Sequence, residues 1–119
     1  MRRLALSLTF AAALTGAASA QQAAYEGNWI CMQNDKQAGL LTIYGNGYGY
    51  ASNSFGDKSS GTGTVQGFSD GVQFKDGPFV SELGLQAGRL LAGEGAVSMT
   101  LERPDSILMI CAPMVTGVS

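Results

Sequence analysis

The stretch GLLTIYGNGYGY, residues 39–50, indicates the fold of this chain more clearly than any other segment. Apolar and polar residues alternate around Asn46-Gly47, and this dipeptide is the strongest short signal for a two-residue type I′ hairpin turn. With Asn46 and Gly47 as the loop, Ile43 pairs with Tyr50. One face of the hairpin then carries four large side chains, which we take as the core side: Leu41, Ile43, Tyr48 and Tyr50.

Short strands of the same kind are predicted near both ends of the chain. Residues 26–32 predict a first strand with Gly27, Trp29 and Cys31 on one face. Residues 96–103 alternate cleanly, and residues 107–112, which are almost all apolar, predict a last strand that is buried on both faces.

Between these strands, turn residues dominate. Residues 53–63 are rich in Gly, Ser, Asp and Asn and predict the longest mobile loop. Weaker strands are predicted at residues 63–66, 72–75 and 88–91, and no stretch predicts an amphipathic helix. The chain is therefore predicted to be all-β: a small antiparallel meander of about eight short strands, closed or nearly closed into a barrel, with one disulfide. A two-sheet sandwich is the alternative.

The first twenty residues have the pattern of a secretory signal peptide. Arg2 and Arg3 precede an apolar stretch, and Ala18-Ser19-Ala20 forms a small-residue cleavage site. We expect residues 1–20 to be removed, leaving residues 21–119 as a single domain that is periplasmic or secreted. In such an oxidising compartment Cys31 and Cys111, one in the first and one in the last predicted strand, are expected to form a disulfide.

Charge and composition exclude several classes of protein. Of the seven basic residues two lie in the leader, so the mature chain keeps five against nine acidic ones, a net charge of −4. This balance argues against nucleic-acid binding and against adsorption to anionic lipid. No second apolar run is long enough for a membrane helix, and the strands are shorter than those of outer-membrane barrels, so no membrane contact is expected.

Groups for catalysis and for cofactors are also scarce. The chain has no histidine, and both cysteines are expected to be oxidised, so neither a metal site nor a cofactor is predicted. Glu82, Glu94 and Glu102 are the candidates for paired-carboxylate hydrolysis, but solvated surface charge is the favoured interpretation. The chain is therefore expected not to be an enzyme.

Gly27-Asn28-Trp29 forms a G-x-W motif at the start of the first predicted strand, and this motif resembles the calycin superfamily of lipocalins, avidins and small bacterial metalloprotease inhibitors. The resemblance implies a barrel in which Trp29 closes one end and Arg103 packs across its ring. The chain departs from these proteins in its single tryptophan and in the wide spacing of its cysteines. It is also similar to small exported bacterial proteins with a glycine-rich meander.

Two functions follow from these features. The first is an exported binding module that engages a protein partner through its loops, in the manner of a protease inhibitor. Phe79, directly after a Gly-Pro turn, would contact that partner if exposed, although we favour its folding back to cap the barrel. The alternative is a carrier that holds a small apolar ligand in the barrel interior, within a pocket lined by Tyr48, Tyr50, Phe74 and Met99.

Overall fold

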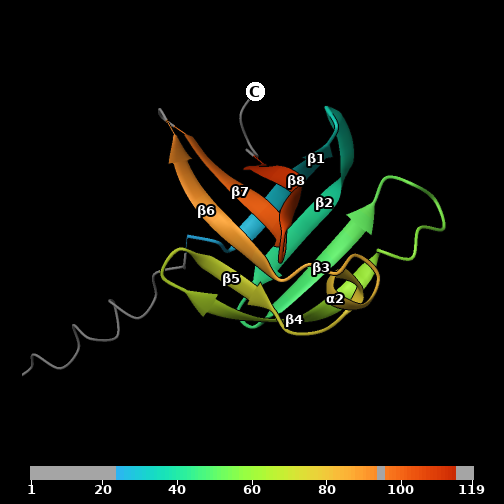
Figure 1. The fold of residues 1–119 in the computed structure, drawn as a ribbon, viewed down its shortest axis with the longest axis horizontal. Helices are drawn as coiled ribbons and strands as arrows, with labels where there is room; N and C mark the ends of the chain where they lie inside the picture. Colours follow the sequence, from blue (N-terminus) through green and yellow to red (C-terminus); the bar gives the residue numbers. More distant parts are fainter. Residues whose placement is uncertain (1–23, 94–95, 115–119) are drawn as a thin grey trace, which may run out of the picture.

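The computed structural model describes residues 24–93 and 96–114, which form a closed antiparallel barrel of eight strands (Figure 1). Each strand pairs with the next along the chain, and the last pairs with the first. The all-β meander barrel is thus confirmed, and the sandwich is not formed. The strands are β1 (Gly27–Gln33), β2 (Lys36–Tyr44), β3 (Gly47–Ser52), β4 (Gly61–Phe68), β5 (Gly71–Phe74), β6 (Ala87–Gly93), β7 (Ala96–Arg103) and β8 (Ser106–Pro113).

A disulfide lies on the line where the barrel closes. Cys31 of β1 and Cys111 of β8 stand opposite each other in the register, and their sulfur atoms are bonded. The bridge spans 80 positions of sequence, and both residues are fully buried. The predicted pairing is confirmed. The barrel is therefore closed between its first and last strands both by backbone hydrogen bonds and by the covalent disulfide.

The hairpin register differs from the prediction. Ile43 pairs with Tyr48 and Leu41 with Tyr50, so the two-residue loop is Gly45-Asn46 rather than Asn46-Gly47. Only Gly45 has a positive φ, of 57°, as a type II′ turn requires at its first central residue. Moving the loop by one position changes each partner by two residues. The same four side chains therefore still face the core, because side chains alternate with a period of two.

A two-residue turn with positive φ at both positions is found instead between β1 and β2. Asn34 and Asp35 have φ values of 54° and 66°, as a type I′ turn requires. Asn and Asp tolerate this left-handed conformation better than other non-glycine residues.

Large side chains pack over glycines inside the barrel. A Cβ at Gly39 would lie 2.6 Å from the Tyr50 hydroxyl, and one at Gly63 would lie 2.5 Å from the Tyr48 ring. Gly67 is exposed, but a Cβ there would also meet an aromatic side chain, that of Tyr25. Pairing large with small residues in this way fills a narrow interior without voids. These glycines therefore serve packing rather than turns.

The segment between β5 and β6 folds back into the barrel. It contains one helical turn, α2 (Pro78–Ser81), in the region that the sequence left ambiguous. Phe79 of this turn is completely buried, and its ring lies 4.8–5.0 Å from those of Tyr48, Tyr50 and Phe74. The Tyr48 hydroxyl donates to the Asp76 carbonyl at 2.9 Å and accepts from the Phe79 amide at 3.0 Å. Phe79 therefore caps the interior, as favoured from the sequence.

The prediction that the last strand is buried on both faces is wrong. Met109 and Cys111 face inward and are buried, whereas Ile107 and Ile110 are 56% and 52% exposed on the outer surface. A barrel of one layer buries only one face of each strand, whatever the composition of the other face.

The antiparallel order gives the barrel two distinct ends. One end, which we call the loop end, carries the β1–β2 turn, the loop at residues 53–60, the α2 segment and the β7–β8 turn. Figure 1 shows the loop between β3 and β4 projecting on the side where α2 lies. We call the other the tryptophan end, because Trp29 is buried there and donates to the Tyr25 carbonyl at 3.1 Å. Among the described residues, no helix is long and apolar enough to cross a membrane.

Candidate functional site

A cavity of about 560 Å³ opens at the loop end, and we call it the mouth pocket. This volume is within the range of sites that bind small molecules. Amides and hydroxyls dominate its lining, from the exposed or half-buried Gln33, Asn34, Gln37, Ser52 and Ser54 and from the buried Ser59. Charged residues also line it: Lys36, Asp57 and Arg103.

The floor of the mouth pocket is less polar. Tyr50 and Met109 line it and are 6% and 2% exposed, with Leu83 and Leu108 beside them. The Tyr50 hydroxyl donates to the Met109 sulfur at 3.7 Å. Burial, assisted by the nearby Asp57 carboxylate, raises the pKa of Tyr50 above its ordinary value. The phenol therefore stays protonated at neutral pH.

The loop at residues 53–60 is ordered by its own hydrogen bonds. Asp57 accepts from the Ser52 hydroxyl at 2.8 Å and from the Ser59 amide at 2.9 Å. These bonds, above all that from the Ser59 backbone, lower the pKa of Asp57 below its ordinary value. The Ser60 hydroxyl accepts from the Ser52 amide at 2.9 Å. The sequence predicted a longer loop, to residue 63, but β4 already begins at Gly61.

Phe55 lies in this hydrogen-bonded loop and is fully exposed. The loop is also joined to β2, because the Asn53 amide donates to the Ala38 carbonyl at 2.8 Å and its side chain donates to the Gln37 carbonyl at 3.2 Å. Residues on both sides of Phe55 are thus fixed to the barrel. Sequence reasoning did not single out Phe55, although one aromatic residue among Gly, Ser, Asn and Asp was a signal that could have identified it.

Arg103 does not pack over Trp29, contrary to the expectation from the calycin resemblance. Cys31, Cys111 and Met99 are neighbours across β1, β8 and β7. Trp29 lies on one side of this row, toward the tryptophan end of the barrel. Arg103 lies on the other side, at the last residue of β7, which is at the loop end. The Arg103 Nε donates to the Leu83 carbonyl at 2.8 Å, and the side chain lines the mouth pocket.

The residues proposed to line an apolar ligand cavity pack against one another instead. Tyr48, Phe74 and Met99 are 4%, 4% and 0% exposed, and the Tyr48 and Phe74 rings lie 5.2 Å apart. Phe79 fills the space beside these two rings and is not available to a partner. Of the predicted contact residues, only Tyr50 reaches the mouth pocket.

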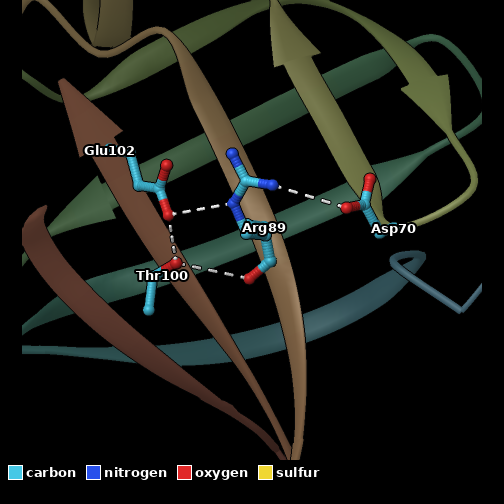
Figure 2. A network of polar contacts seen from close by, with 4 residues as sticks. All are labelled: Asp70, Arg89, Thr100 and Glu102. Atoms are coloured by element: carbon cyan, nitrogen blue, oxygen red, sulfur yellow. Dashed lines mark hydrogen bonds and ion pairs between the residues drawn. The ribbon is translucent and has the colours of Figure 1, made fainter. Parts of the chain in front are cut away.

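The candidate carboxylates do not meet in the mouth pocket. Glu82 is exposed after α2, and Glu102 lies on the outside of the barrel, where its carboxylate accepts from Arg89 at 3.3 Å and from Thr100 at 2.8 Å (Figure 2). Glu94 lies outside the described residues. Asp57 is the only carboxylate among the described residues that line the mouth pocket, so paired-carboxylate chemistry has no site there. The described part of the chain contains no group of three or more His, Cys, Asp or Glu residues placed to hold a metal ion.

Comparison with known proteins gives no relative: no protein-family model matches the chain, and neither a curated protein nor a solved structure matches it. The calycin resemblance therefore stays a prediction that depends on the G-x-W motif.

Proposed function

We propose that this protein is an exported binding module that engages a protein partner through the loop end of its barrel. The observation that carries the proposal is Phe55, a fully exposed aromatic side chain in a loop fixed by hydrogen bonds. Aromatic residues are enriched in the buried centres of protein interfaces. A loop that is already ordered by hydrogen bonds loses less conformational entropy on binding than a disordered loop.

The apolar-carrier alternative has less support. The interior that would hold such a ligand contains the ring of Phe79, which contacts Tyr48, Tyr50 and Phe74. Opening a cavity there would require α2 to leave the barrel and break the hydrogen bonds to the Tyr48 hydroxyl.

Export is part of the proposal and has its own test. The leader pattern and the buried disulfide both fit an oxidising compartment. Protein recovered from its own cells should begin at Gln21 and be found in the periplasm or the medium. Recovery of a chain that still carries residues 1–20 in the cytoplasm would contradict export.

The binding proposal is tested by comparing two aromatic substitutions. Phe55→Ala removes the proposed anchor, and Phe68→Ala removes a half-exposed phenylalanine at the end of β4 that leads toward the tryptophan end. Each variant is cross-linked in the exported fraction beside the unaltered protein. A partner that is retained by Phe68→Ala and lost with Phe55→Ala supports the proposal. Identical cross-linking patterns from all three proteins would overturn it.

An inhibitor-like role is the more specific form of this proposal. It predicts that the protein reduces the activity of an exported protease in a saturable way, and that Phe55→Ala weakens this inhibition while Phe68→Ala does not.

A further inference from the structure

The mouth pocket holds two of the five basic residues of the predicted mature chain, although that chain carries an excess of acidic groups. Lys36 lies at the start of β2, and Arg103 lies at the end of β7. The lining thus has two cationic groups against one anionic group, Asp57. This local charge is opposite in sign to that of the whole chain and favours an anionic ligand.

Arg103 lines the mouth pocket and is hydrogen-bonded at one edge of its guanidinium group. Its Nε donates to the backbone carbonyl of Leu83 at 2.8 Å, which restrains the guanidinium plane. Within residues 24–93 and 96–114, neither Nη1 nor Nη2 of Arg103 has a hydrogen-bond or ion-pair partner. The planar guanidinium group matches a carboxylate, which accepts two parallel hydrogen bonds.

Arg89 on the outer surface shows the opposite arrangement. Its Nε contacts Glu102 at 3.3 Å and its Nη1 contacts Asp70 at 3.5 Å (Figure 2). The carboxylates that Arg89 needs are supplied by the chain itself. For Arg103, the described part of the chain supplies one partner, the Leu83 carbonyl at Nε. An external anion would therefore give Nη1 and Nη2 their hydrogen-bond partners.

The remaining polar groups of the pocket include acceptors for a ligand that also donates hydrogen bonds. The ionised Asp57 carboxylate only accepts, and the side-chain amides of Gln33 and Gln37 each have an oxygen that accepts and an NH2 group that donates. A carboxylate ligand with hydroxyl or N–H groups beside it satisfies both sides of the pocket.

We propose that the mouth pocket binds a carboxylate that has hydroxyl or N–H groups next to it, with the carboxylate against Arg103 and Lys36. Such a group occurs in free hydroxy acids and at the C-terminus of a polypeptide. The site goes beyond the proposed function, because it does not include Phe55 and binding there does not require a protein partner.

The test is an NMR titration of the full mature protein with two pairs of probes. Gluconate is compared with sorbitol, which lacks the carboxylate, and trialanine is compared with its C-terminal amide. We expect saturable shifts of the Ser59 and Gln37 amides with gluconate, trialanine or both, and none with sorbitol or the amide. Binding of gluconate alone assigns the site to free hydroxy acids, and binding of trialanine alone assigns it to chain termini.

Variants connect the binding to the proposed residues. Arg103→Gln should weaken the affinity at least about tenfold, and Lys36→Gln should weaken it several-fold. Arg89→Gln and Lys58→Gln are matched controls outside the pocket lining and should leave affinity unchanged. If loss of the contact to Leu83 unfolds Arg103→Gln, Arg103→Lys keeps the charge and should still bind more weakly.

Two results would overturn the site: no saturable shift with either carboxylate probe, or equal weakening by the control variants. Phe55→Ala should bind the probes like the unaltered protein. Loss of the partner in that variant therefore reports on the proposed protein-binding function and not on the carboxylate site.

Discussion

Phe55 and Phe79 have the same side chain in opposite environments at the loop end of the barrel. Phe79 is fully buried among three aromatic rings, whereas Phe55 is fully exposed in its loop. Burial decides what each one does. Phe79 stabilises the fold by removing apolar surface from water, whereas Phe55 leaves its apolar surface exposed to solvent.

Alanine substitution should separate these two roles. Phe79→Ala is expected to lower the free energy of unfolding by about 3–5 kcal/mol, because it leaves a cavity between Tyr48 and Phe74. Phe55→Ala should change it by no more than about 0.5 kcal/mol. Urea unfolding of the two variants measures both values. Equal midpoints would show that Phe79 does not fill the interior.

Because Asp57 accepts two hydrogen bonds that order the loop at residues 53–60, we expect the order of this loop to depend on pH. Its folded pKa is lowered, so the hydrogen bonds to its carboxylate are fully present above the ordinary Asp value of about 4 and are lost as the pH falls through the folded pKa. The NMR shift of the Ser59 amide, which donates to Asp57, should therefore titrate below about pH 4. Asp57→Asn should abolish this titration. A midpoint at or above the ordinary value would contradict the arrangement.

At the scale of the strand, the space around a glycine depends on whether it lies on the inner or the outer face of the barrel. Gly39 of β2 faces inward, where a Cβ would overlap the Ala51 carbonyl oxygen and lie 2.6 Å from the Tyr50 ring. Gly47 of β3 has no other atom closer than 3.7 Å to such a Cβ. Neither residue has a positive φ, so space rather than backbone conformation distinguishes them.

The pair Gly39→Ala and Gly47→Ala tests this distinction. Gly39→Ala should destabilise the protein by about 1–3 kcal/mol, because the Ala51 backbone and the Tyr50 ring must both shift. Gly47→Ala should be neutral or stabilise by up to about 1 kcal/mol, since alanine restricts the unfolded chain more than glycine does. Thermal unfolding of both variants measures the difference. Similar losses in both would show that the strand conformation, not the interior packing, requires glycine.

At the scale of the whole molecule, closure of the barrel depends on the pairing of β1 with β8. Seven of the eight pairings join strands adjacent in sequence, whereas this one brings together the two ends of the meander. Loop closure of this length is unfavourable in entropy, and the disulfide reduces that cost by restricting the unfolded chain.

Removal of both cysteines, by Cys31→Ala with Cys111→Ala, should lower the free energy of unfolding by about 2–5 kcal/mol. The double substitution avoids leaving a single thiol in the core. Urea unfolding with and without a reducing agent measures the effect, and the reducing agent should leave the double variant unchanged. If the unaltered protein unfolds at the same urea concentration when reduced, the bridge does not contribute to closure.

Local pattern alone determined the strand content, the inward face of the central hairpin and the pairing of the cysteines. Each depends on the alternation of side chains along a strand or on the presence of only two cysteines. The same local rules failed at residues 45–47, where the loop is Gly45-Asn46 and lies one position before the strongest local turn signal. The amide of Gly45 donates to the carboxylate of Glu26, which lies just before β1, at 2.6 Å, and local pattern does not include this contact.

Only the tertiary structure decided which groups meet at the loop end. Lys36, Asp57 and Arg103 belong to distant parts of the sequence and share a pocket because alternate strand connections return to the same end of the barrel. The resemblance placed Arg103 over Trp29, but the register of β7 carries it to the opposite end. Alternation along a strand specifies whether a side chain faces the inside or the outside of the barrel. How far apart two residues lie along the barrel axis depends on the register of every strand between those two residues.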